Sequence, residues 1–180
     1  MRCLRNLTTV GVILMAVSIA VAQAGASGGS SAQPKLTNSA SSIDALLDAF
    51  QKALDARDEQ ALHRLRVTEQ EYCDIIIPGT VKPGEAPRTV APTPSAFWWS
   101  MINQKSEDTA RMFLERFGGH KTKRIAVTFS KGTREFAWYK AHGDVRLTLE
   151  DEQGRQRELH TGAIAEIDGQ FKFIGFNTNN

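Results

Sequence analysis

Apolar and polar residues alternate along the last third of the chain, from Lys121 to Phe176. A period of two is typical of half-buried strands. The predicted strands are 124–129, 136–140, 145–150, 156–167 and 171–176. His142-Gly143-Asp144 is predicted to be a turn, and Asp168-Gly169 a two-residue hairpin, because glycine adopts positive φ without penalty. Since every connection is short, the strands are expected to be antiparallel neighbours in a curved sheet with one apolar face.

A period of three to four residues precedes this sheet and predicts helices. Ser41 or Ser42 should cap the first helix and Asp58 a short second one, while Thr68 with Glu71 forms the capping box of a third. The apolar stripe of the first helix is Ile43, Leu46, Leu47, Phe50 and Leu54. Helices followed by strands indicate an α+β fold, in which a curved antiparallel sheet of four to six strands packs against the N-terminal helices.

A proline-rich loop at 78–95 interrupts the helical half and carries five of the six prolines. A loop of this length inside a domain acts as a lid or a binding loop, or is a surface excursion without a role. Pro78 should end the third helix. Another helix is expected to start at Thr93-Pro94, to break near Ser106–Asp108 and to end at Gly118-Gly119.

The first 24 residues have the pattern of a secretory signal peptide. Arg2 and Arg5 precede an uncharged apolar run, and Ala22-Gln23-Ala24 fits a small-x-small cleavage pattern. An uncleaved membrane anchor is the alternative, but the run is short for a span of about 20 residues. Residues 25–41 are rich in Gly, Ser and Ala and are predicted to be a flexible linker to a single domain, 42–180. The protein is therefore expected to be exported, periplasmic or secreted, with no stable membrane anchor after cleavage.

Cleavage would also change the charge balance. The chain has 22 Lys+Arg and 20 Asp+Glu, and loss of Arg2 and Arg5 leaves 20 of each. A nucleic-acid partner is not expected, since such proteins carry a surplus of clustered basic residues. Cys73 would be the one remaining cysteine, either a small buried apolar residue or a bridge between two chains.

The segments Ser42–Asp58 and Ala163–Phe173 resemble the opening helix and the last hairpin of the nuclear transport factor 2-like (SnoaL-like) superfamily. The resemblance covers about Ser42 to Phe176. It implies a conical fold whose helices and curved sheet enclose a pocket. It also implies a function among isomerases, dehydratases, polyketide cyclases and proteins that only bind ligands or partners. The chain departs from the family after the second helix, where Thr68–Ile77 and the proline-rich loop replace the usual strands unless Ile75–Ile77 forms a short one. The acid or base of the family's enzymes sits at subgroup-specific places on the pocket wall, so no catalytic residue is carried over.

An apolar pocket of this kind would raise the pKa of a carboxylate and suit it to act as a general base, so a catalytic residue is expected near aromatic side chains. The candidate pocket-lining residues are Tyr72, Asp74, Trp98, Trp99, Trp138, Tyr139 and His160. Plain packing or exposure is the alternative for each. Trp98 and Trp99 point about 100° apart on a helix, so one is expected in the core and the other over the pocket or at a dimer contact. Trp138 and Tyr139 should face opposite sides of their strand.

The sequence offers no metal or hydrolase motif. The histidines show no His-x-His or His-Glu-x-x-His spacing, and no Gly-x-Ser-x-Gly or phosphate loop occurs. Neither a metal ion nor a cofactor is predicted. Three functions remain: an exported domain that binds a small apolar ligand or a protein partner without catalysis; an isomerase, dehydratase or cyclase that uses a pocket Asp or His; and a cell-envelope interaction module that acts through the outer sheet face. A homodimer is compatible with the first and the third.

Overall fold

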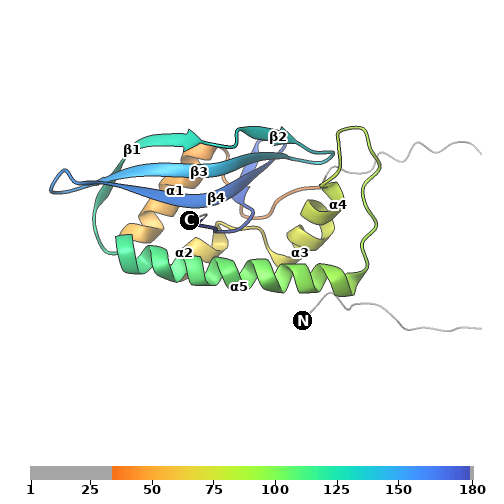
Figure 1. Cartoon of the computed structure of the whole chain (residues 1–180), viewed down its shortest axis with the longest axis horizontal. Coiled ribbons are helices and arrows are strands. Elements are labelled where there is room, and N and C mark those ends of the chain that lie inside the picture. Colours follow the sequence, from red (N-terminus) through yellow and green to blue (C-terminus); the bar gives the residue numbers. More distant parts are fainter. Residues whose placement is uncertain (1–33, 179–180) are drawn as a thin grey trace, which may run out of the picture.

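Helices occupy the first half of the described chain and strands the second (Figure 1). The structure is a computed structural model that describes residues 34–178, so the predicted signal peptide 1–24 and linker residues 25–33 lie outside it. The helices are α1 (Ile43–Asp55), α2 (Glu59–Arg64), α3 (Glu69–Glu71), the π-helical turn η1 (Tyr72–Ile76), α4 (Ile77–Gly79) and α5 (Pro92–Phe117). The strands are β1 (Thr122–Phe129), β2 (Thr133–Glu135), β3 (Lys140–Asp151), β4 (Gln156–Ile167) and β5 (Gln170–Phe173).

Three predicted helix caps are confirmed. The Ser42 hydroxyl accepts a hydrogen bond from the amide of Ala45, and the Asp58 carboxylate accepts one from Ala61. Thr68 and Glu71 form the capping box, with both reciprocal bonds in place. Each cap satisfies amide groups that the first helical turn leaves without partners, and so marks where a helix begins.

Helix α5 differs from the expectation in length. It is a single helix of 26 residues without a break near Ser106, and it begins at Pro92, so the proline-rich loop shortens to 80–91. Ser106 is 1% exposed and faces the interior, where its hydroxyl bonds to the C-terminal segment. The expected break near Ser106 is therefore wrong, because this polar residue is buried and hydrogen-bonded within a continuous helix.

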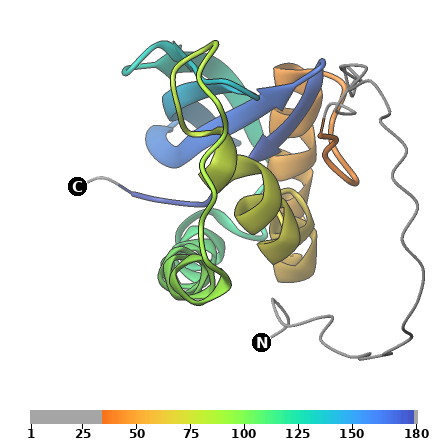
Figure 2. The same ribbon diagram turned by 90° about the vertical axis from the view of Figure 1, so that its right-hand side faces the viewer.

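The sheet is open and antiparallel, with the order β1-β3-β4-β5 and β2 paired to β3. The fold is therefore α+β, with five strands, within the predicted range. The two-residue hairpin between β4 and β5 is confirmed, because both Asp168 (φ 49°) and Gly169 (φ 72°) adopt positive φ. Figure 2 looks along α5 and shows this helix beneath the sheet, with α1 to one side.

Strand β3 runs through the predicted turn at residues 142–144. The pairing with β4 shifts between His142 and Val145, so Gly143 and Asp144 form a β-bulge inside one continuous strand. The predicted strand 136–140 is wrong as well, because the chain from Phe136 to Tyr139 is the turn between β2 and β3. Trp138 and Tyr139 consequently do not point to opposite faces of a strand. Both pack against the same apolar cluster.

Strand β4 is irregular at the same level, opposite the bulge of β3. Leu159 and Ile164 both lie in the main core, although they are an odd number of residues apart. The alternation therefore changes phase at Thr161 and Gly162, so His160 and Ile164 lie on opposite faces although they are an even number of residues apart. A similar shift in β1 after Arg124 leaves Ile125 42% exposed.

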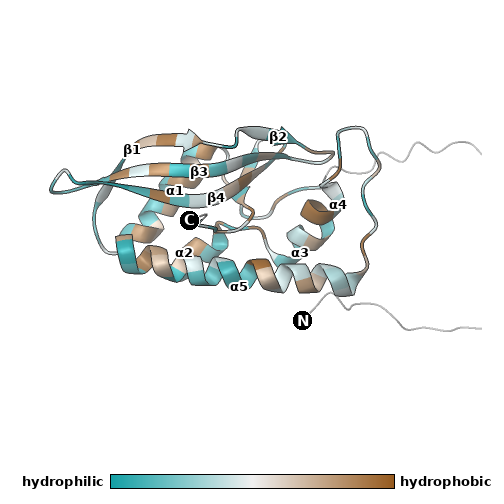
Figure 3. Ribbon diagram, in the orientation of Figure 1, coloured by the Kyte–Doolittle hydropathy of each residue, from teal (hydrophilic) through white to brown (hydrophobic). Residues whose placement is uncertain are grey.

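Two apolar clusters fill the space between helices and sheet. The larger joins α1, α2 and the second half of α5 to β3, β4 and the residues around Phe173. The smaller joins η1 and the first half of α5 to the chain around Tyr139 and to Ala165 and Ile167. Figure 3 shows apolar and polar residues alternating along β1, β3 and β4, as this packing requires.

The last part of the predicted linker packs on the domain. Leu36 is 4% exposed in the smaller cluster, and Ala40 pairs with Phe171 of β5. The domain therefore includes residues from Leu36 onward, rather than beginning at residue 42.

Candidate functional site

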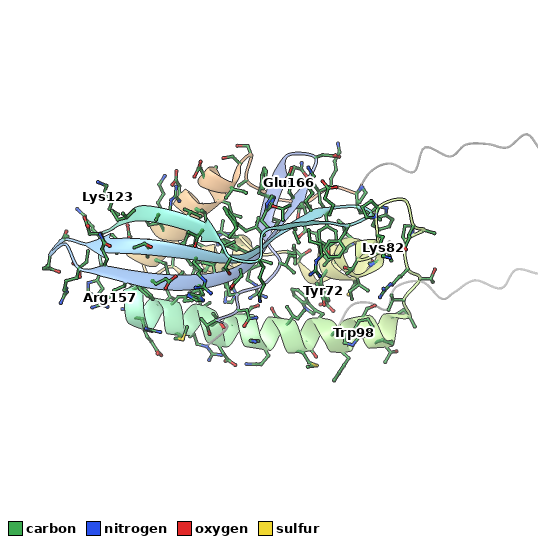
Figure 4. All side chains as sticks on the ribbon, turned by 45° about the horizontal axis from the view of Figure 1, so that its top comes forward. Tyr72, Lys82, Trp98, Lys123, Arg157 and Glu166 are labelled. Atoms are coloured by element: carbon green, nitrogen blue, oxygen red, sulfur yellow. The ribbon has the colours of Figure 1, made fainter. Side chains whose placement is uncertain are left out.

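The seven candidate residues do not form one site. Tyr72, Trp99, Trp138 and Tyr139 meet in the smaller cluster, whereas Asp74 is exposed. Trp98 is 44% exposed and projects away from α5, while Tyr72 points into the interior (Figure 4). Trp99 is the inward-facing member of the tryptophan pair.

Packing explains the buried aromatic candidates. The ring of Tyr72 lies 5.6 Å from that of Trp99, and Phe136 stacks on Tyr139 at 4.8 Å. The Tyr139 hydroxyl forms a 2.7 Å hydrogen bond with that of Thr80. Burial raises the pKa of both tyrosines above the usual value, so they stay neutral and act as packing groups.

His160 lies apart from these residues, on the face of β4 opposite Leu159. Its side chain is 22% exposed, and its Nε2 lies 3.7 Å from the Glu158 carboxylate. Among the candidates, Trp99 alone lines one of the two pockets described next.

The first pocket, which we call the bulge pocket, has a volume of about 290 Å³ and lies between α5, the bulged part of β3 and β4, and the C-terminal segment. Its apolar side chains are Ile102, Ala163, Ile174 and Phe176. Lys105 and Lys131 are exposed and stand at its rim, whereas Phe176 is 1% exposed at its base. The lining is therefore mainly apolar with charged groups at the mouth.

Glycine allows three chain segments to meet at this pocket. Gly162 has φ 98°, and a Cβ there would lie 2.5 Å from the carbonyl oxygen of Gly175. A Cβ on Gly175 would in turn lie 2.8 Å from the Ser106 hydroxyl. The amide of Phe176 donates a 3.0 Å hydrogen bond to the Ser106 oxygen, which fixes the C-terminal segment to α5. Side chains at these glycines would push the segment away from the sheet.

Asp144 is the polar residue that the bulge brings to this pocket. It is 8% exposed and has φ 51°, a conformation that aspartate tolerates better than most residues. Its Oδ2 accepts a hydrogen bond from the Ser130 hydroxyl and lies 3.5 Å from Arg146, whereas its buried Oδ1 has no hydrogen-bond partner. The Ser130 hydrogen bond lowers the pKa of Asp144, against the effect of burial, so the carboxylate stays ionised at neutral pH.

The second pocket, which we call the Arg66 pocket, has a volume of about 390 Å³ and lies where α5 passes the α2–α3 connection and β5. Trp99, Asn103 and Glu107 face it from successive turns of α5, because residues four apart share a helix face. Arg66 and Lys172 supply two buried cations, 3% and 1% exposed.

The positive charge of Lys172 is compensated by the carboxylate of Glu71. Its ammonium group lies 2.8 Å from the Glu71 carboxylate, which also accepts hydrogen bonds from the Thr37 amide and hydroxyl and from the Thr68 amide. Burial raises the pKa of Glu71, but these hydrogen bonds lower it by more, and the net shift is downward. The pair ties the N-terminal segment, α3 and β5 together.

The described part of the chain holds no group of three or more His, Cys, Asp or Glu residues placed to bind a metal ion. Within residues 34–178, no helix is both long and apolar enough to cross a membrane.

Sequence reasoning missed the polar residues of both pockets. The sequence pattern predicts a turn at Asp144, although a Gly-Asp pair within a β pattern is also typical of a bulge. Arg66 stands between Leu65 and Val67, and a charged residue between apolar ones is the signal that could have indicated a buried arginine. Asn103 and Glu107 carry no signal of their own, because only the fold brings them next to Arg66.

Comparison with known protein families, with characterised proteins and with solved structures finds no match to this chain.

Proposed function

We propose that this chain is an exported binding domain of the nuclear transport factor 2-like type, which holds a small, largely apolar ligand in the bulge pocket without catalysis. The observation that carries the proposal is this pocket of about 290 Å³, which has a mainly apolar lining and includes Asp144, whose buried Oδ1 has no hydrogen-bond partner. Helices followed by a five-stranded antiparallel sheet are compatible with that family's architecture. The signal-peptide pattern in residues 1–24 supports export.

The lining indicates the chemistry of the ligand. The pocket is near the lower end of the range of about 300–1,000 Å³ found for small-molecule sites, so the ligand is compact. Contact with Ile102, Ala163 and Phe176 favours an apolar body, at about 25 cal/mol per Å² buried. Oδ1 of Asp144 can accept a hydrogen bond from one hydroxyl or N–H group of the ligand, which removes the cost of leaving that oxygen unpaired.

The electrostatics of Asp144 favour binding over proton transfer. A general base that works near neutral pH needs a pKa close to that value, and enzymes obtain it by raising the pKa of a carboxylate. The Ser130 hydrogen bond lowers the pKa of Asp144 instead, which makes this carboxylate a weak base. The alternative, an isomerase, dehydratase or cyclase with a pocket Asp or His, is therefore less well supported.

A neutral fluorescent probe tests the proposal. N-phenyl-1-naphthylamine is apolar and carries one N–H group, so it should bind with a rise in fluorescence. Ala163→Leu should fill the pocket and weaken binding at least tenfold, whereas the same change at the exposed Ala126 of β1 should leave it unchanged. Equal binding by the wild type and by Ala163→Leu would rule out the bulge pocket as the site.

A second candidate function, self-association, rests on a different observation. Phe97, Trp98 and Met101 are 61%, 44% and 57% exposed on the first half of α5. Met101 also borders the surface formed by Gln104, Lys105 and Asp108, so a second copy packed on this face would cover the three exposed apolar side chains. Light scattering should then show a dimer that the double change Phe97→Ser and Met101→Ser converts to a monomer.

The outer face of the sheet supports an envelope interaction module less well. On that face the Glu158 carboxylate lies 3.8 Å from Arg146 and 3.7 Å from the His160 ring. Exposed ion pairs of this kind contribute little binding energy.

A further inference from the structure

The Arg66 pocket contains a buried cation that the protein itself does not fully satisfy. Arg66 follows α2, pairs with Phe173 at the end of β5 and is 3% exposed. Arginine stays charged in proteins, so its burial places a permanent positive charge between α5 and the sheet. Buried charges are normally paired with an opposite charge or a full set of hydrogen bonds, because losing hydration is costly.

The partners of Arg66 are neutral and incomplete. Its Nη2 donates a 2.6 Å hydrogen bond to Oδ1 of Asn103, and its Nη1 donates to Nδ1 of His63 at 3.2 Å. Its Nε is buried without a partner. Two of the five guanidinium N–H groups are thus accounted for.

No carboxylate among the described residues lies within 4.0 Å of the Arg66 guanidinium. The Glu107 carboxylate acts on the charge of Arg66 without touching it. It is linked to Arg66 through Asn103, whose Nδ2 donates to Oε1 of Glu107 at 2.7 Å. Lys172, the other buried cation of the pocket, has its own carboxylate at 2.8 Å. The contrast between these two cations singles out Arg66.

Aromatic rings complete the surroundings of the guanidinium. Its carbon lies 6.0 Å from the centre of the Trp99 ring and 5.8 Å from that of Phe176. Such contacts hold the guanidinium plane in place but do not supply the hydrogen-bond acceptor that Nε lacks. The pocket of about 390 Å³ beside it offers room for a ligand that supplies the missing acceptor.

We propose that the Arg66 pocket binds the carboxylate of a small monocarboxylic acid, which accepts hydrogen bonds from Arg66 while its apolar part lies against Trp99. A planar carboxylate matches the fork of a guanidinium. Glu107 also lines the pocket and repels anions, so a single negative charge is favoured over a dianion such as sulfate. This site lies in a different pocket from the proposed apolar ligand and does not depend on it.

Fluorine NMR on the purified protein tests the proposal with a matched pair of probes. 4-Fluorobenzoate and 4-fluorobenzamide have the same ring, but only the first carries a charge. Binding should broaden and shift the signal of the benzoate, and affinity for the neutral amide should be at least tenfold lower. Equal binding of the two probes, or no binding of either at millimolar concentration, would overturn the proposal. Displacement of the benzoate by sulfate as effectively as by unlabelled benzoate would also overturn it.

Variants of the pocket make the test specific. Arg66→Gln should weaken benzoate binding about tenfold to a hundredfold, the range expected for losing a charged hydrogen-bond donor. Arg111→Gln removes an arginine of α5 whose side chain is 54% exposed and does not line this pocket, so affinity should stay within about twofold. Unchanged binding by folded Arg66→Gln would contradict the proposal.

Glu107→Gln supplies a test that does not depend on the stability of the Arg66 variant. Removing the anion opposite Arg66 should strengthen benzoate binding several-fold. Unchanged or weaker binding by this variant would contradict an anion site at Arg66. Ala163→Leu, which fills the bulge pocket, should leave benzoate binding unaltered, so failure of one proposal is distinguishable from failure of the other.

Discussion

Replacing Lys172 by Met should destabilise the domain strongly, because it breaks the buried pair that joins three parts of the fold. Lys172 and Glu71 are 1% and 5% exposed, and their charged groups lie 2.8 Å apart. Methionine keeps most of the volume of the lysine stem but supplies no charge. The Glu71 carboxylate would then remain buried without its cation.

The expected magnitude follows from what Glu71 retains. Breaking a buried ion pair by removing one partner costs about 3–5 kcal/mol, since the other charge stays uncompensated. Three donors remain on Glu71, the amide and hydroxyl of Thr37 and the amide of Thr68. We therefore expect the free energy of unfolding to fall by about 3 kcal/mol, the lower end of that range.

Urea unfolding followed by circular dichroism measures this change, and its pH dependence identifies the cause. The folded pKa of Glu71 is lowered, so its contribution to stability is present above its unfolded pKa and is lost as the pH falls through the folded value. Without Lys172 the folded pKa of Glu71 rises, so the part of the stability loss on acidification that comes from Glu71 should become smaller than in the wild type. The double variant Glu71→Gln/Lys172→Met should be less destabilised than the sum of the two single changes.

Lys52→Met is the matched control, because Lys52 is exposed on α1 and should tolerate the change within about 0.5 kcal/mol. If Lys172→Met lowers the free energy of unfolding by less than about 1 kcal/mol, with an unchanged dependence of that free energy on urea concentration, the reasoning is refuted.

Three further changes test local features of the fold. Gly162→Ala should lower the free energy of unfolding by more than about 2 kcal/mol in urea, because a Cβ there would lie 2.5 Å from a backbone oxygen and φ is 98°. Gly154→Ala, with φ 74° and open space around it, should lower it by about 1 kcal/mol in the same assay. The lowered pKa of Asp144 makes the wild type lose stability as the pH falls, so the melting temperature of Asp144→Asn should depend less on pH between neutral and acid conditions. Ser42→Ala should cost about 1 kcal/mol through loss of the α1 cap, whereas Ser41→Ala should be neutral in the same thermal assay.

The parts of the fold that depend on local chemistry could be predicted from the sequence. The caps at Ser42, Asp58 and Thr68 each involve a side chain and an amide three residues away, so a short stretch determines them. The hairpin at Asp168-Gly169 is equally local. The α+β class followed from the change of period along the chain.

The bulges could not be predicted, and several other errors follow from them. The position of a bulge depends on how two strands pair. The shifts of register between β3 and β4 place His160 on the face of the sheet opposite Ile164. Tyr72, Trp138 and Tyr139 pack in the smaller cluster and line neither pocket, Trp98 is exposed, and Trp99 both packs in that cluster and lines the Arg66 pocket. Asp144 and Arg66 matter because strands, helix and C-terminal segment meet around them, and no single stretch of sequence contains that information.

Native mass spectrometry of the purified protein tests the central claim, a ligand in the bulge pocket, most directly. The account predicts a small molecule that is retained by the wild type under gentle conditions, lost on denaturation and absent from Ala163→Leu. A wild-type protein with no added mass, or the same added mass in Ala163→Leu, would contradict it.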